Sequence, residues 1–241
     1  MQLLSRALCA AFLLNAGAAQ AFEPVIETTA LSIGGNGYDP VVDISLIGET
    51  NTSVSFSLHG IAGGYSLGTD SSYQPFSGDY LAWNNFYDIA VKDGYKVTGI
   101  TVSGHFWGEL SPAQWTMPGV ATNEMSFSFD VHQLGNPPIE SNGAHAQNLN
   151  TQQAFSLVTG GTALQGEFSV SFAGFNSVGA ESVMYYDELY NETYWLGSRA
   201  YSGMGDLVMT IEVSPVPEPA TYGMMLGGMG LLAFAARRRR A

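Results

Sequence analysis

Strict alternation of large apolar and small polar residues is the feature that most limits what this chain can fold into. Four segments show it: Val54 to Leu58, Met125 to Val131, Phe168 to Phe172 and Leu207 to Val213. Successive side chains of a strand point to opposite faces, so each segment predicts a strand with one buried face. Weaker runs at 29–33, 42–46, 87–91 and 95–110 predict further strands, and no long amphipathic helix is indicated.

Turn-forming Gly, Asn, Ser and Pro residues separate these segments. About eight to ten strands of this kind predict an all-β fold, an antiparallel two-layer sandwich that is jelly-roll-like, with a closed barrel as the alternative. The apolar parity changes across Gly99, from Val97 to Ile100, which predicts a β-bulge. Two longer irregular stretches, 61–79 and 135–150, are expected to be loops that carry binding function.

The first residues of the chain have the pattern of a secretory signal peptide. Arg6 precedes an apolar stretch, and Ala19-Gln20-Ala21 has the A-x-A form of a signal-peptidase site. We therefore expect a signal peptide at 1–21 and a single-domain β-sandwich body at 22–214. Cys9, the one cysteine, leaves with the signal peptide, so the mature chain is expected to form no disulfide.

Residues 215–241 have the features of a tail that inserts into a membrane. Ala220 to Ala236 carries no charge, and its length of about 25 Å as a helix just reaches across a bilayer core. This pattern predicts one transmembrane helix in the precursor. The basic residues that follow it stay on the cytoplasmic side, which places the body outside: Arg237, Arg238, Arg239 and Arg240.

Val216-Pro217-Glu218-Pro219-Ala220-Thr221, followed by a glycine-rich apolar span and a terminal arginine cluster, resembles the PEP-CTERM sorting signal of Gram-negative bacteria. The resemblance implies recognition of Pro217, Glu218 and Pro219 by an exosortase-type membrane enzyme. It also implies transient anchoring in the inner membrane, then delivery to the cell surface or the extracellular polysaccharide matrix. It covers only the tail. A plain tail anchor is the alternative, but it leaves the Pro-Glu-Pro motif unexplained.

Charge narrows the partners of the mature body. Once both targeting segments are removed, the chain keeps three basic residues, Lys92, Lys96 and Arg199, and twenty acidic residues. Its net charge is therefore −17. Such a surface repels nucleic acid and anionic lipid and attracts cations. We therefore expect no nucleic-acid partner.

Tyr185 to Trp195 is a run of aromatic and acidic residues. Aromatic faces packed on the apolar faces of sugar rings, with carboxylates that accept hydroxyl hydrogens, form a polysaccharide site. The candidate glycan-binding residues are Tyr186, Tyr190, Tyr194 and Trp195. The alternative, which we expect for Trp195, is that alternate aromatics fill the sandwich core.

Other candidate sites are weaker. Gly34 to Val42 matches a single calcium-binding nonapeptide, but such sites lie between stacked repeats, so a hairpin turn is expected there and no metal or cofactor is predicted. The histidines are not paired at metal-ligand spacing: His59, His105, His132 and His145.

No catalytic motif occurs in the sequence, so no catalytic residue is predicted. The sequence favours an exported, non-catalytic protein of the cell surface or biofilm matrix, structural or adhesive in role. The alternative is a β-sandwich module that binds glycan, either alone or with the help of calcium.

Overall fold

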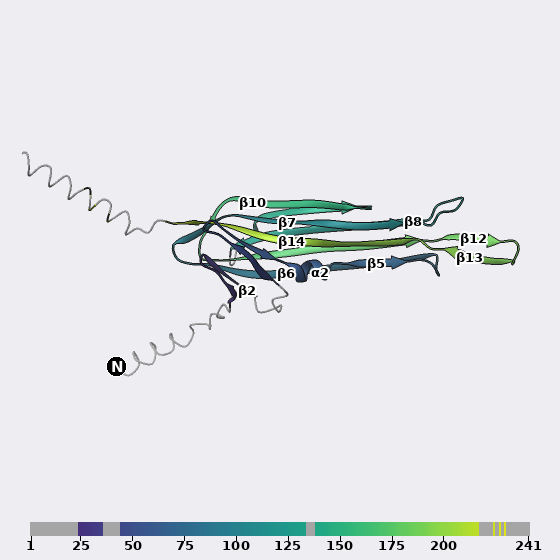
Figure 1. Ribbon diagram of the computed structural model, residues 1–241, viewed down its shortest axis with the longest axis horizontal. Coiled ribbons are helices and arrows are strands. Elements are labelled where there is room, and N and C mark those ends of the chain that lie inside the picture. Colours follow the sequence, from purple (N-terminus) through teal and green to yellow (C-terminus); the bar gives the residue numbers. More distant parts are fainter. Residues whose placement is uncertain are drawn as a thin grey trace, which may run out of the picture.

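The computed structural model describes residues 24–35, 44–133 and 138–216, together with Met224, Gly227 and Met229. Two antiparallel sheets stack as an elongated sandwich (Figure 1), which confirms the predicted two-layer architecture. The predicted signal-cleavage residues Ala19 and Ala21, the sorting motif at 217–219 and the arginines at 237–240 lie outside the described residues.

The first sheet has six strands. In spatial order they are β1 (Pro24–Glu27), β2 (Leu31–Gly35), β6 (Phe76–Val91), β11 (Glu167–Glu181), β8 (Val120–Gln133) and β9 (Pro138–Gln147). The second sheet consists of β10 (Gln152–Leu164), β7 (Tyr95–Ser111), β14 (Arg199–Pro215), β4 (Ser53–Ser57) and β3 (Ser45–Glu49), with β5 (Leu67–Asp70) paired to the start of β14. A short helix, α2 (His59–Gly63), follows β4, and β12 (Val183–Asp187) and β13 (Glu192–Leu196) form a separate hairpin.

The chain passes repeatedly from one sheet to the other. β6, β7 and β8 lie in the first, second and first sheets, and β9, β10 and β11 repeat this alternation before β14 returns to the second sheet. These crossings make the sandwich jelly-roll-like and place strands from all parts of the chain around one core.

The hydrophobic core lies between the sheets. The alternating positions predicted from the sequence are all buried there: Val54, Phe56, Leu58, Met125, Phe127, Phe129, Val131, Phe168, Val170, Phe172, Leu207, Met209, Ile211 and Val213. Each such side chain contributes about 1.5–3 kcal/mol by leaving water. The predicted bulge is also confirmed, because β14 pairs Glu212 with Gly99 but Val213 with Val97, so Thr98 is passed over.

The predicted loops were partly wrong. Residues 61–79 contain most of α2, all of β5 and the start of β6, and residues 135–150 contain β9. The structure describes fourteen strands rather than eight to ten. β9 escaped prediction because it lies at the edge of its sheet, where backbone hydrogen bonds to β8 hold a strand whose side chains are mostly polar or small.

The two ends of the sandwich differ. Strand β14 finishes at Pro215, and the N–H of Val216 donates to the carbonyl oxygen of Gly94 (2.8 Å), in the turn between β6 and β7. The chain therefore leaves toward its sorting tail from this end, which we name the proximal end. The opposite, distal end consists of residues 71–75, 112–119 and the β12–β13 hairpin (Figure 1). Strand β14 alone, with 17 residues, spans about 55 Å.

Candidate functional site

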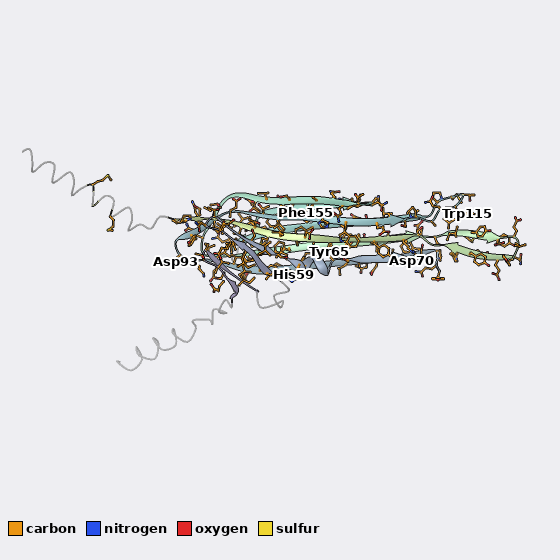
Figure 2. The ribbon with its side chains drawn as sticks, in the orientation of Figure 1. His59, Tyr65, Asp70, Asp93, Trp115 and Phe155 are labelled. Carbon is orange, nitrogen blue, oxygen red and sulfur yellow. The ribbon has the colours of Figure 1, made fainter. Side chains whose placement is uncertain are left out.

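Large exposed apolar and aromatic side chains gather at and near the distal end. They are Tyr73, Phe76, Tyr80, Trp115, Met117, Met184, Tyr186, Leu189, Tyr190, Tyr194 and Trp195. Figure 2 shows Trp115 at this end and Asp93 at the proximal end. Exposed apolar side chains that cluster in this way mark interaction sites, whereas single exposed apolar side chains are normal on any protein surface.

The β12–β13 hairpin presents six of these side chains on two strands and a short turn. Its strands are rich in aromatic and β-branched residues, which favour extended backbone. In the turn, Asp187 Oδ1 accepts the N–H groups of Leu189 (2.9 Å) and Tyr190 (3.4 Å). Asn191 then takes a left-handed conformation with φ of 54°, which Asn tolerates better than most residues.

The register of the hairpin divides its side chains between two faces. Tyr185 lies opposite Tyr194 on one face. Met184 lies opposite Trp195 on the other face, together with Tyr186. Both faces are open to solvent along most of their length.

Three aromatic rings form a continuous row on the first face, which we name the ring row: Trp115, Tyr185 and Tyr194. The Trp115 and Tyr185 centroids are 4.5 Å apart with the planes at 66°. The Tyr185 and Tyr194 centroids are 6.5 Å apart with the planes at 26°, so these two rings are offset and nearly parallel. Trp115 is 48% exposed and Tyr194 is 42% exposed, so the row keeps open aromatic surface.

Carboxylates lie beside the Tyr194 end of the ring row. The Tyr194 hydroxyl donates to Glu192 Oε2 (2.6 Å), and this hydrogen bond, with desolvation and the neighbouring charges of Glu192 and Asp187, raises the pKa of Tyr194. On the other face the Tyr186 hydroxyl donates to Asn191 Oδ1 (2.5 Å). Residues 183–196 contain three acids, Asp187, Glu188 and Glu192, and neither Lys nor Arg. The arrangement offers aromatic surface bordered by hydrogen-bond acceptors.

Ser198 fixes the base of the hairpin to the body. Its buried Oγ donates to the carbonyl oxygen of Glu181 (2.6 Å) and accepts the N–H of Ala113 (2.9 Å). Its N–H donates to Ser71 Oγ (3.0 Å). One residue therefore joins the end of β11, the 112–119 segment that carries Trp115, and the 71–75 turn. A two-stranded hairpin is marginal alone, so these contacts and Trp115 set its direction.

The structure places the four sequence-predicted glycan candidates at the distal end but does not bring them onto one face. Tyr194 belongs to the ring row, Tyr186 and Trp195 lie on the opposite face, and Tyr190 lies in the turn. The expectation that Trp195 is a core residue was wrong, because the side chain is 36% exposed on a hairpin that projects past the sandwich. Sequence reasoning missed Tyr185 as the partner of Tyr194 and Trp115 as the partner of Tyr185, and no sequence signal links Trp115 to the hairpin.

The histidines do not assemble into a site. His132 Nε2 lies 3.0 Å from Ser171 Oγ, His145 Nε2 lies 3.2 Å from Glu124 Oε1, and His105 Nδ1 lies 3.5 Å from Asp206 Oδ2. Within the described ranges, no group of three or more His, Cys, Asp or Glu residues is arranged to hold a metal ion. Gly34 and Gly35 close β2, and the rest of the candidate calcium nonapeptide lies outside those ranges.

The tail matches the family model of the PEP-CTERM protein-sorting motif over residues 215–240. This match confirms the resemblance to an exosortase substrate, and it indicates an exported protein that is sorted through the membrane. The match is confined to the tail and assigns nothing to the sandwich. Among the residues that the structure describes, no helix is both long and apolar enough to cross a bilayer, and the predicted span at 220–236 lies almost entirely outside them.

Solved structures show weak similarity to the body. Tailspike protein 4 of bacteriophage CBA120, in its enzymatically active domain, is 12% identical over 75% of this chain and 19% of that chain, with a TM-score of 0.25. TmCBM61 in complex with beta-1,4-galactotriose is 8% identical over 76% of this chain and 94% of that chain, with a TM-score of 0.24. A structure of infectious bursal disease virus, Gx strain, is 11% identical over 83% and 43% of the two chains, with a TM-score of 0.29.

The chain thus spans less than two thirds of the tailspike and viral chains. All three TM-scores are below 0.5 and carry no conclusion about function. No curated protein matches the chain significantly.

Proposed function

We propose that this protein is a non-catalytic adhesive protein of the cell surface or exopolysaccharide matrix of a Gram-negative bacterium, processed by an exosortase-type enzyme. One observation carries the proposal: the last residues before the sorting motif, Pro215 and Val216, lie at the proximal end, whereas the exposed aromatic side chains gather at the distal end. A protein attached through the proximal end would present the distal end outward.

The distal half is built to hold this end in a fixed place. Asn176 Nδ2 on β11 donates to the carbonyl oxygens of Tyr65 (2.7 Å) and Ser202 (3.3 Å), and Ser202 Oγ on β14 donates back to Asn176 Oδ1 (2.6 Å). Both side chains are fully buried, so hydrogen bonds cross the sandwich beside the core residues Tyr65 and Met125. A rigid support lowers the ordering cost of binding at the tip.

The chemistry of the distal end suits binding. The hydroxyls of Tyr194 and Tyr186 donate to Glu192 and Asn191, and the Glu192 carboxylate lies beside the Tyr194 ring. The proposal includes no reaction. Glycan recognition is the second candidate function, and the ring row is the observation that favours it.

Removing the hairpin tests the adhesive role. Val183 and Leu196 are directly paired, so an Asn-Gly turn can replace residues 184–195 and close the ladder without disturbing the body. We expect the shortened protein to be exported and processed normally but to appear in the medium instead of the matrix fraction. Fractionation and immunoblotting in a host with an exosortase measure this.

A matched control removes exposed apolar side chains elsewhere. Ile47 on β3 and Val158 on β10 are both exposed away from the distal end. The variant Ile47→Ser with Val158→Ser should remain in the matrix fraction. Matrix retention of the shortened protein at the level of this control would overturn the proposal.

A further inference from the structure

We infer that the ring row of Trp115, Tyr185 and Tyr194 binds an uncharged polysaccharide, with Glu192 and Asp187 accepting sugar hydroxyl hydrogens. This inference rests on the proposed function and names the ligand class of the distal end. It selects one face of the hairpin and excludes the other.

Ring chemistry supports a sugar ligand. A pyranose ring presents C–H groups on its faces and hydroxyls around its edge, so it packs against an aromatic face and donates hydrogen bonds at the border. The ring row supplies both elements: open aromatic surface on Trp115 and Tyr194, and the Glu192 carboxylate 2.6 Å from the Tyr194 hydroxyl.

The rings contact one another at 4.5 and 6.5 Å between centroids, so no sugar fits between them. The ligand must therefore lie across the outer surface of the row, as an extended polymer does.

Charge decides which polysaccharide. The hairpin and the 112–119 segment together carry Asp187, Glu188 and Glu192 and no basic residue. Arg199, at the start of β14, is engaged by Asp70 (Nε to Oδ2, 2.8 Å). An anionic polymer lying on the row would meet uncompensated carboxylates within the screening length of about 10 Å at 0.1 M salt. A neutral polymer meets no such repulsion.

The same charges disfavour a second copy of this chain. Two hairpins meeting tip to tip would bring two sets of the same three carboxylates together with no basic residue of the hairpin between them. Self-association is therefore an outcome that the experiment must separate from glycan binding.

The ring row is favoured over the opposite face because the body holds it in place. Trp115 comes from the 112–119 segment, whose Ala113 N–H is bound by the buried Ser198 Oγ. The Trp115 ring in turn packs against Tyr185. On the opposite face, no aromatic contact joins Met184, Tyr186 or Trp195 to the sandwich among the described residues. Rings fixed in advance lose less conformational freedom when a ligand binds.

Affinity electrophoresis of the processed, secreted protein tests the inference. One set of gels contains a neutral polymer: mixed-linkage β-glucan, galactan or methyl-esterified polygalacturonate. A further gel contains the anionic polymer, de-esterified polygalacturonate. The last two polymers share a backbone and differ in charge. We expect retardation by at least one neutral polymer and none by the de-esterified polymer. Retardation by no neutral polymer, or stronger retardation by the charged one, would overturn the inference.

Two triple variants locate the binding face. Trp115→Ala, Tyr185→Ala and Tyr194→Ala together should weaken retardation about tenfold or more, since aromatic contacts supply the affinity. Met184→Ala, Tyr186→Ala and Trp195→Ala together should leave it within twofold. The single variant Tyr194→Phe keeps the ring and should retain binding even if the triple ring-row variant loosens the hairpin. The reverse ranking of the two triple variants would contradict the assignment.

Sedimentation and fractionation separate the remaining outcomes. A dimer that dissociates when the ring row is substituted would assign the distal end to contact between copies and overturn the glycan inference. Loss of matrix retention on hairpin removal, but not on ring-row substitution, would leave the proposed function standing and reject this site. Retention unaffected by either change would reject both.

Discussion

Trp83 and Gly174 lie directly opposite each other on β6 and β11, and the indole ring occupies the space that a side chain at 174 would need. A Cβ on Gly174 would lie 2.7 Å from Cζ2 of Trp83 and 2.7 Å from Cε2 of Tyr65. The arrangement recurs where Trp107 covers Gly203 and where Tyr201 covers Gly68. Aromatic rings thus cover the glycine backbone at three cross-strand positions in the distal half of the sandwich.

Gly174→Ala should lower the free energy of unfolding by about 1–3 kcal/mol, because two rings must move to admit one methyl group. Urea denaturation measures the change. Gly160→Ala on β10 is the control, since a Cβ there meets nothing within 4 Å. Equal stability of the two variants would show that the rings yield without cost.

Asn176 and Ser202 should behave as one unit. Asn176→Ala removes the donor to Tyr65 and leaves the Ser202 hydroxyl buried without its acceptor, at a cost of about 1–3 kcal/mol. Ser202→Ala on top of it should add little, because its partner is already gone. A double-mutant cycle by urea denaturation measures the coupling, and fully additive losses would contradict a shared hydrogen-bonded pair.

Asp88→Asn should stabilise the protein at neutral pH. Burial, and then the nearby charge of Glu167, raise the pKa of Asp88 above the ordinary aspartate value of 3.8. The ionised carboxylate therefore destabilises the folded state above its folded pKa. This penalty fades as the pH falls through that value and is absent below 3.8. Denaturation midpoints at pH 7.5 and 3.5 test the sign, and an advantage of the variant that persists at the lower pH would contradict this cause.

Replacing Pro217, Glu218 and Pro219 together by alanine should leave export intact but stop processing, so that an uncleaved form accumulates in the membrane fraction. The apolar span and the arginines act through solvation, whereas the motif acts through recognition of an extended peptide. The matched control substitutes Ser214 and Val216 by alanine and should be processed. Immunoblots of membrane and medium fractions decide, and normal release of the triple variant would make the tail a simple anchor.

Calcium and sodium at equal ionic strength should raise the melting temperature of the mature protein equally. With a net charge of −17, the body gains stability when its carboxylates are screened, and a single copy of the calcium nonapeptide predicts no specific calcium site. Thermal unfolding in the two salts measures this. A larger shift with calcium would show a specific site by linkage.

The strands with strong alternation were predictable because burying one face is a local property of the sequence. The positions Val54, Phe129 and Ile211 each repeat the parity of their neighbours and each lie in the core. β9 and the first half of β6 were not predictable, since their pairing depends on neighbours that are distant in the chain.

The candidate site divides in the same way. The composition of residues 185–195 singled out the hairpin, but its alternation alone indicated a strand with a buried face and made Trp195 a core residue. Parity states which side chains share a face and says nothing about whether a second layer covers that face.

The sequence by itself determined the sorting motif and the strongly alternating strands, because each depends on a few consecutive residues. Only the tertiary structure decided that the hairpin projects past the sandwich, opposite the end from which the tail departs. It also brought Trp115 against Tyr185, across seventy residues of sequence. These relationships depend on the lengths and the pairing of β7, β11 and β14. Because these strands are far apart in the sequence, no local pattern predicts how they pair.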